Sequence, residues 1–212
     1  MRQAAVAMAA VLAISGTAAP ASASSPEGTA FVAAFAEACV PQRLSYSGTV
    51  AHAKSAGWVD TAMGAHSELG TVLSVADRET KDVAEEGWTF ERTPLSREIS
   101  GREHFLVVTR VFAPEIITLI GCYLYDFDAT EAIDPQPVTA FVGNPIGRTI
   151  EDKGLVQYTW GPNHDARPRT LDTNLSFIAE DSPHVGVTGF SGLVLKFETS
   201  EPDPGNGSGK TE

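Results

Sequence analysis

The sequence predicts an α+β domain, with N-terminal helices packed on one face of a mostly antiparallel sheet of about five or six strands. Two observations carry this prediction. Apolar residues recur at helical spacing in residues 29–76, whereas β-branched and aromatic runs dominate from residue 89 onward. The runs are separated mostly by short turns, without the strand-helix alternation of a parallel sheet, so neighbouring strands are expected to be antiparallel.

Three helices are expected before the first convincing strand. The first covers residues 29–39 and stops at Pro41, since a proline disfavours helical backbone in the residue before it. The second ends at Gly57, where a left-handed cap is expected, and Trp58 follows as a core anchor. The third begins after Ser67, which is the candidate N-cap residue.

The second half of the chain is predicted to be mainly strands. The expected strands are residues 89–95, 104–112, 115–127, 155–160, 175–180 and 193–199. The turn-like residues 113–115 make a hairpin of the second and third strands. Asp134 and Pro135 are typical of an N-cap and a first helical residue, so a short helix is expected after the third strand.

The ends of the chain predict an exported protein. Residues 1–23 have a charged start, an apolar run and small residues before the expected cleavage point, which is the layout of a secretory signal peptide. Residues 24–198 are then a single globular domain, and residues 199–212 are a disordered tail without an apolar anchor. A periplasmic or extracellular location is expected, with no membrane insertion after signal cleavage.

The charge balance narrows the range of partners. The chain has 15 basic and 27 acidic residues, a formal net charge of −12, and loss of Arg2 with the signal peptide would make it −13. Nucleic acids and anionic membrane surfaces are recognised by clustered lysine and arginine, so neither is an expected partner. A cationic envelope protein or a small ligand remains open.

Two cysteines, Cys39 and Cys122, are the only ones in the chain. In an exported protein such a pair is most simply one disulfide. Both lie on apolar stretches, one on the first helix and one in the third strand, so both are expected at the seam between helix and sheet. Neither has a neighbouring histidine in sequence, which a reactive thiol would need.

A resemblance supports this reading of the fold. A helix ending in Cys39, a second helix ending in the residues 53–58 (AKSAGW), and Cys122 in a central strand before a short helix resemble a set of small exported bacterial proteins of uncharacterised activity. The resemblance covers about half of the chain. It implies an exported α+β domain with one disulfide, and it implies no activity, cofactor or catalytic residue.

An acidic stretch is the first candidate site. Asp126, Asp128 and Glu131 are candidate ligands for a hard cation such as calcium. The spacing does not fit an EF-hand, because position six of the loop is Glu131 where glycine is needed. The favoured interpretation is that Asp126 and Asp128 point outward at a strand end and that Asp134 caps a helix.

Two further pairs are candidates for catalysis. His164 and Asp165 lie in a loop rich in glycine and proline, and Glu85 and Glu86 lie beside aromatic residues, as the carboxylates of a glycosidase do. For each pair, solvated surface charge is the simpler and favoured interpretation. No cofactor-binding motif is present in the sequence.

The sequence therefore does not define one activity. The favoured hypothesis is a non-catalytic binding or inhibitory protein of the cell envelope. The alternative is a glycosidase-like or esterase-like hydrolase whose site is assembled from separated residues.

Overall fold

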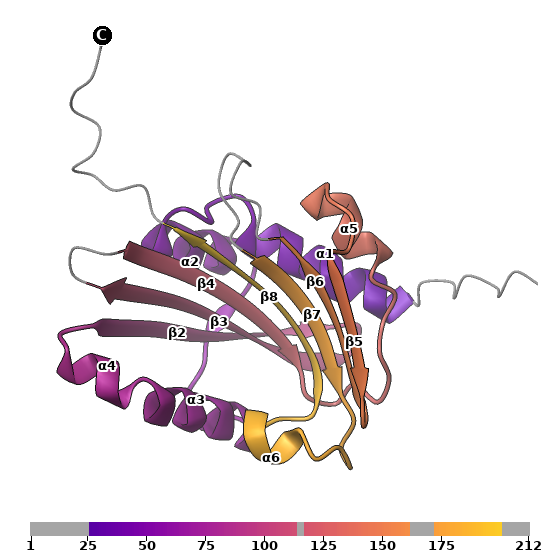
Figure 1. Ribbon diagram of the computed structural model, residues 1–212. Coiled ribbons are helices and arrows are strands. Elements are labelled where there is room, and N and C mark those ends of the chain that lie inside the picture. The colour runs from indigo at the N-terminus through magenta and orange to yellow at the C-terminus, as the bar shows by residue number, and fades with distance from the viewer. Residues whose placement is uncertain (1–25, 114–116, 162–171, 201–212) are drawn as a thin grey trace, which may run out of the picture.

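Eight antiparallel strands form one sheet at the centre of the protein, and helices lie on both of its faces (Figure 1). The computed structural model describes residues 26–113, 117–161 and 172–200 of the chain. The predicted signal peptide therefore lies outside the described residues. The last strand ends at Ser200, two residues beyond the predicted end of the globular domain at residue 198.

Within the described residues there are six helices and eight strands. The helices are α1 (Pro26–Cys39), α2 (Tyr46–Ser55), α3 (Ser67–Glu79), α4 (Lys81–Glu85), α5 (Gln136–Val142) and α6 (Val185–Thr188). The strands are β1 (Val59–Asp60), β2 (Thr89–Ile99), β3 (Arg102–Ala113), β4 (Ile117–Asp126), β5 (Arg148–Asp152), β6 (Leu155–Trp160), β7 (Asp172–Ile178) and β8 (Gly192–Ser200).

The sheet is built from two meanders that meet in its middle. The strand order is β1-β2-β3-β4-β8-β7-β6-β5. After β4 the chain passes through α5 to the far edge, where β5 starts the second meander, and this meander returns strand by strand to β8. The pairing of β4 with β8, which aligns Cys122 with Phe197, joins the two halves. Central strands therefore come from segments far apart in sequence.

Helices α1, α2 and α5 cover one face of the sheet. Phe31 and Phe35 of α1 are buried there together with Trp58 and with alternate residues of the central strands, such as Leu124. Successive side chains of a strand point to opposite faces, so every second residue of β3, β4 and β8 contributes to this layer. This is the larger of the two apolar cores.

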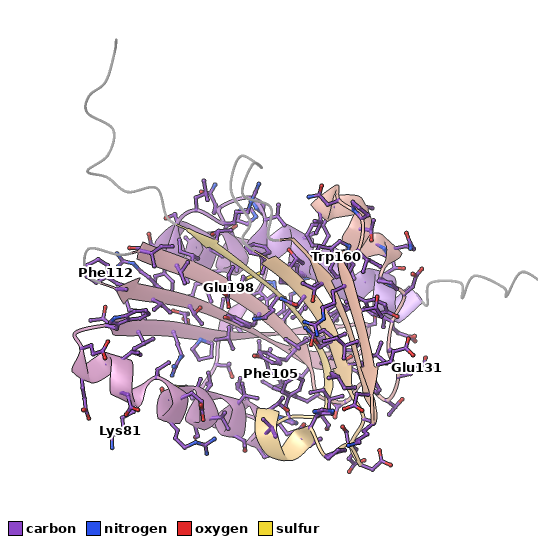
Figure 2. All side chains as sticks on the ribbon, in the orientation of Figure 1. Lys81, Phe105, Phe112, Glu131, Trp160 and Glu198 are labelled. Atoms are coloured by element: carbon purple, nitrogen blue, oxygen red, sulfur yellow. A yellow bond between two sulfur atoms is a disulfide. The ribbon has the colours of Figure 1, made fainter. Side chains whose placement is uncertain are left out.

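Helix α3, with α4 and α6, covers the opposite face. Leu69 and Leu73 of α3 pack against Phe105, Val107 and Tyr125, the residues that alternate with those of the first core. Figure 2 shows Phe105 between the sheet and α3. The third predicted helix thus lies on the second face, and the expectation that the N-terminal helices share one face is wrong.

The α+β class is confirmed, but the sheet has eight strands where five or six were expected. The two additional strands are the edges. Strand β1 has only two residues, and both are exposed. Strand β5 has one partly buried residue, Ile150, among exposed ones. Neither edge carries an apolar alternation, so the main signal of a strand is missing from their sequence.

The helix ends show how local chemistry sets the boundaries. Ser45 caps α2 by accepting a hydrogen bond from the Gly48 amide, and Gly57 follows with a left-handed φ of 91°. Trp58 is then 1% exposed, which confirms it as a core anchor. Helix α3 is capped by His66 and not by Ser67, because the His66 Nδ1 accepts from the Glu68 amide at 3.3 Å.

Candidate functional site

A cleft of about 920 Å³ opens at one end of the sheet, where α3 begins and the turns after β4 and β7 come together. We call it the acidic cleft. It is lined by His66, Glu68, Phe127, Asp128, Ala129, Thr130, Phe177, Ala179, Glu180, Asp181, Val185 and Ser191. Among the residues that the structure describes, this lining has four carboxylates and no lysine or arginine. The cleft therefore favours a cation.

The floor of the acidic cleft is aromatic. The imidazole of His66 stacks on the ring of Phe127, with centroids 4.8 Å apart and planes 8° from parallel. Phe127 in turn packs against Phe105 and Phe190. Since the His66 Nδ1 accepts from the Glu68 amide, a proton on the neutral ring lies on Nε2. An apolar floor with a carboxylate rim matches the two parts of a lysine or arginine side chain.

The four carboxylates of the acidic cleft differ in their surroundings. Glu68 accepts from the Ser191 amide at 2.8 Å and from the Ser191 hydroxyl at 2.9 Å, which ties the segment before β8 to the start of α3. Asp128, Glu180 and Asp181 are exposed, and within the described ranges none of them has an ion-pair partner. Three negative charges are thus available to a partner.

A second cavity, of about 360 Å³, lies beside the first turn of α1, and we call it the α1 cavity. Its lining includes Asp126, which is only 1% exposed. The Arg102 Nη2 lies 2.9 Å from Asp126 Oδ2, and the His104 Nε2 lies 3.4 Å from the same oxygen. The His104 Nδ1 donates to the Arg102 carbonyl at 2.9 Å. Asp126 Oδ1 has no hydrogen-bond partner.

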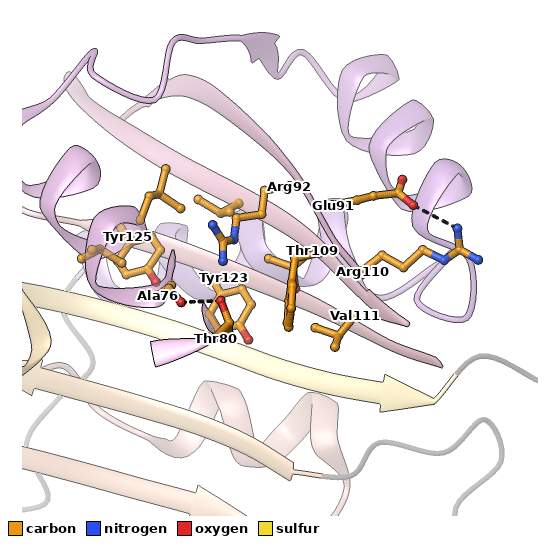
Figure 3. Close-up of a pocket in the computed structure, with 13 residues that line it drawn as sticks. Ala76, Thr80, Glu91, Arg92, Thr109, Arg110, Val111, Tyr123 and Tyr125 are labelled. Carbon is orange, nitrogen blue, oxygen red and sulfur yellow. Dashed lines mark hydrogen bonds and ion pairs between the residues drawn. The ribbon is translucent and has the colours of Figure 1, made fainter. Parts of the chain in front are cut away.

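A third cavity, the α3 groove, lies between α3 and strands β2, β3 and β4 (Figure 3). Its volume is about 190 Å³, and most of its wall is apolar, from residues such as Val72, Leu73 and Val107. Glu91 and Arg110 form an ion pair of 3.1 Å at its edge. The groove differs from the acidic cleft because it offers little charge that a polar ligand could pair with.

Two tyrosines at the α3 groove are held in the phenol form. The Tyr123 hydroxyl donates to Glu198 Oε1 at 2.8 Å. Burial, together with the nearby Glu198 carboxylate, raises the pKa of Tyr123 well above its ordinary value. Burial alone raises the pKa of Tyr125. Lys196 lies 3.4 Å from Glu198 and 5.7 Å above the Tyr123 ring, which completes a small polar cluster on the sheet.

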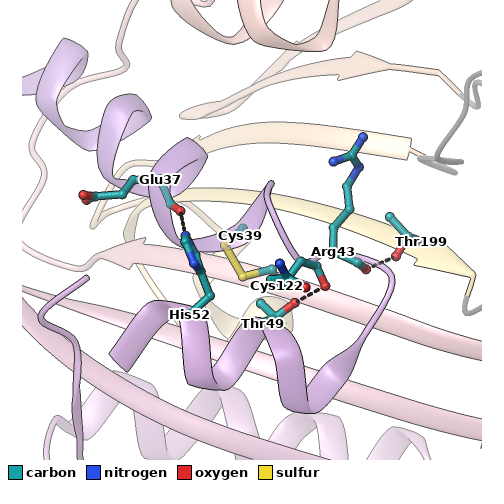
Figure 4. Close-up of a disulfide and its surroundings, with 8 residues drawn as sticks. Glu37, Cys39, Arg43, Thr49, His52, Cys122 and Thr199 are labelled. Atoms are coloured by element: carbon teal, nitrogen blue, oxygen red, sulfur yellow. Dashed lines mark hydrogen bonds between the residues drawn. A yellow bond between two sulfur atoms is a disulfide. The ribbon is translucent and has the colours of Figure 1, made fainter. Parts of the chain in front are cut away.

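The predicted disulfide is present. Cys39 at the end of α1 is bonded to Cys122 in β4, with 6.0 Å between their Cα atoms (Figure 4). Both cysteines are fully buried, as expected for a bond at the helix-sheet seam. Beside it, the His52 Nε2 of α2 donates to the Glu37 carbonyl of α1 at 3.0 Å. The disulfide therefore lies in the layer of α1 and α2, where a hydrogen bond also joins the two helices.

The three candidate metal ligands do not converge on one site. Asp126, which is buried against Arg102, and Glu131, which is exposed, both line the α1 cavity, whereas the exposed Asp128 lines the acidic cleft. The interpretation that Asp126 points outward is wrong, because its side chain faces α1 with those of Cys122 and Leu124. The helix after Asp134 is present but begins one residue later than predicted, with Pro135 as its N-cap; the Asp134 Oδ1 still accepts from the Gln136 amide at 2.9 Å. In the described part of the chain, no three histidine, cysteine or acidic side chains are placed to hold a metal ion.

Of the residues suggested for catalysis, the structure describes only Glu85 and Glu86. Glu85 and Glu86 are exposed at the end of α4, and neither lines the acidic cleft, the α1 cavity or the α3 groove. His164 and Asp165 lie outside the described residues. Within those residues, no helix combines the length and apolar character needed to cross a bilayer.

Sequence reasoning missed most of the residues that line the acidic cleft. Glu180 is the last residue of the predicted strand 175–180, Asp181 follows it directly, and Glu68 lies in the first turn of the third predicted helix; none of the three was a candidate site residue. Only the fold brings them near Asp128, so no local signal could have grouped them. The chain matches no protein-family model, no curated protein and no solved structure.

Proposed function

We propose that this protein is a non-catalytic domain of the cell envelope that binds a cationic partner protein in the acidic cleft. One observation carries the proposal: the described lining of this cleft has four carboxylates and no lysine or arginine. The formal net charge of −12 acts in the same direction over longer distances. Such a protein could restrain a basic enzyme by occupying its surface.

The physical basis is the concentration of charge in a concave site. A single exposed ion pair contributes only about 0 to 1 kcal/mol, so one carboxylate would not make a binding site. Several carboxylates in one cleft add their fields, which raises the local concentration of a cationic partner and its association rate. The stacked rings of His66 and Phe127 then offer a surface for the methylene groups of a basic side chain.

Export is part of the same proposal. The bond between Cys39 and Cys122 is compatible with an oxidising compartment, where disulfides form and persist. The signal-peptide layout of residues 1–23 supports a periplasmic or extracellular location. The hydrolase alternative lacks a comparable observation: Glu85 and Glu86 line none of the three cavities above, and His164 and Asp165 lie outside the described residues.

The proposal is tested with two triple variants of the full chain and a short lysine-rich peptide as the probe. The cleft variant carries Asp128→Asn, Glu180→Gln and Asp181→Asn. The control variant carries Asp82→Asn, Glu85→Gln and Glu86→Gln on exposed positions in and just after α4, so both lose three negative charges. Titration calorimetry at low salt should show affinity reduced about tenfold or more in the cleft variant, and about twofold in the control.

Salt provides the second readout. Affinity of the unmodified protein for the peptide should fall steeply as salt increases, because exposed charges are screened over about 10 Å at 0.1 M salt. An equal loss of peptide affinity in both triple variants would show that net charge, and not the acidic cleft, determines binding, which would contradict the proposal. Absence of peptide binding at low salt would also contradict the proposal.

A further inference from the structure

Asp126 holds a carboxylate oxygen that has no hydrogen-bond partner among the described residues. The residue is 1% exposed, and its Oδ1 is buried without a hydrogen bond. A buried acceptor without a partner destabilises a protein by about 1 to 3 kcal/mol, and more when it is charged. Such an atom in a folded protein calls for an explanation, and a ligand group is one of them.

The neighbours of Asp126 are directed to its other oxygen. Arg102 and His104 both lie on Oδ2, at 2.9 and 3.4 Å. The His104 Nδ1 is committed to the Arg102 carbonyl, so the ring cannot turn toward Oδ1 without losing that bond. The positive charge of Arg102 is therefore balanced at Oδ2, and Oδ1 stays available as an acceptor.

The α1 cavity supplies the rest of a site next to Asp126. Its lining also includes the carboxylates of Glu27 and Glu131, and Arg102 is its only base among the described residues. Figure 2 shows Glu131 at the edge of the molecule. Apolar wall area comes from Phe31, Ile133 and Leu193. The cavity thus joins a buried acceptor and an acidic rim to a wall that suits methylene groups.

We propose that the α1 cavity binds a primary ammonium group, as on a lysine side chain, with Asp126 Oδ1 as the acceptor. Ala129 and Thr130 line both the α1 cavity and the acidic cleft, so one basic partner can reach both. As a lysine subsite for that partner, the inference rests on the proposed function. The ammonium site itself can be tested without the partner.

The geometry favours an ammonium group over other donors. A guanidinium is a planar fork suited to both oxygens of a carboxylate, and Oδ2 is already occupied by Arg102. An ammonium is a compact charge with three donors, which can bond Oδ1 and still face the rim carboxylates. A neutral hydroxyl could donate to Oδ1 but would gain nothing from Glu27 and Glu131.

The test compares two small probes by NMR titration of the full chain. The first is N-acetyl-lysine-N-methylamide, and the second is the norleucine analogue, which has the stem without the ammonium. The lysine probe should bind at least about tenfold more tightly, as expected for a charge-assisted hydrogen bond, and should shift the signals of Arg102 and His104. Equal binding of the two probes would overturn the proposal.

Variants locate the site. Asp126→Asn keeps the shape and should abolish binding of the lysine probe. Because this change could also impair folding, Glu27→Gln with Glu131→Gln provides a second test at exposed positions, with an expected loss of about fivefold. The matched control is Glu98→Gln with Glu103→Gln, two exposed acids paired across β2 and β3. An unchanged affinity in the rim variant, or an equal loss in the control, would contradict the assignment.

The two proposals fail in different ways. The triple variant of the acidic cleft should still bind the lysine probe, because Asp126, Glu27 and Glu131 are unchanged. Binding of the probe without binding of the lysine-rich peptide would support the ammonium site and contradict the partner proposal. Binding of the peptide without binding of the probe would overturn the ammonium site alone.

Discussion

At the scale of single residues, Tyr123 depends on the absence of a side chain at Gly121. A Cβ added at Gly121 would lie 2.5 Å from Thr109 Oγ1 and 2.6 Å from Tyr123 Cε2. The glycine therefore lets the Tyr123 ring lie across β4, where its hydroxyl reaches Glu198. One small residue thus sets the polar cluster beside the α3 groove.

This arrangement predicts a loss of stability in alkaline solution. The pKa of Tyr123 is raised in the folded protein, so folding holds its proton more tightly than the unfolded chain does. Its contribution is fully present below the ordinary phenol pKa of 10.0 and is lost as pH rises through the higher folded-state pKa. Tyr123→Phe should reduce this alkaline loss, as measured by urea unfolding over a pH series.

Two features make the Tyr123 prediction specific. Urea unfolding of Tyr123→Phe at neutral pH measures the cost of the lost hydrogen bond to Glu198. This cost is thereby separated from the effect of Tyr123 ionisation at high pH. Some alkaline loss should remain in the variant, because burial raises the pKa of Tyr125 in the same direction. An unchanged pH dependence in Tyr123→Phe would contradict the prediction.

Asp126 shows why single residues could not be placed from the sequence. Its position at the end of an apolar strand and next to other acids is equally compatible with an outward metal ligand and an inward ion pair. The choice depends on Arg102 and His104, which are more than 20 residues away and adjacent only because β3 and β4 pair. Strand register therefore decided the role of this carboxylate.

At the scale of elements, β8 starts where its backbone lies close to the end of β4 and the residue after it. Gly192 has a φ of 91°, and a Cβ at this position would clash with the Asp126 carbonyl oxygen and lie 3.0 Å from atoms of Phe127. These neighbours are backbone atoms, which cannot move aside as the end of a flexible side chain can. Glycine is required both for the backbone conformation and for the space.

Gly192→Ala should lower the free energy of unfolding by about 2 to 4 kcal/mol, the sum of crowding and of an unfavourable backbone conformation. Urea unfolding measures the loss. Gly186→Ala in α6 is the control, because nothing lies within 4 Å of a Cβ there. Its stability should change by less than about 1 kcal/mol. Similar losses in the two variants would contradict this account of the start of β8.

The elements themselves were predictable where their pattern was strong. Six of the eight strands and the first three helices follow from apolar periodicity, Gly57 was assigned by its capping chemistry, and the helix after Asp134 was predicted to within one residue of its start. The edge strands β1 and β5 were missed because their exposed residues carry no alternation. The second helical layer was also missed, although residues 105–108 form a continuous apolar run, which is typical of strands buried on both faces.

At the scale of the whole molecule, the disulfide connects the start of the described chain to the centre of the sheet. Cys39 and Cys122 are 83 residues apart, and β4 pairs with both β3 and β8. The bond therefore fixes α1 to the strand at which the two meanders meet. Through α1 it also helps to hold the wall of the α1 cavity.

Removal of the disulfide should weaken the whole fold. In the chain-entropy model, a loop of this size contributes about 4.5 kcal/mol by restricting the unfolded chain. The double variant Cys39→Ala, Cys122→Ala should lose an amount of this order in urea unfolding without reductant. Treatment of the unmodified protein with reductant should give a similar loss. A change of less than about 1 kcal/mol would contradict the proposed role.

The sequence by itself determined the α+β class and the main helices and strands, because helical and strand periods are properties of neighbouring residues. It also determined the pairing of the cysteines, because the chain has only two. Tertiary structure alone decided that helices cover both faces, that β8 lies beside β4, and that Glu68, Asp128, Glu180 and Asp181 share one cleft. These outcomes depend on contacts between segments that are distant in the chain. No local pattern records such contacts, since each acid has the same chemistry in a solvated turn as in a binding site.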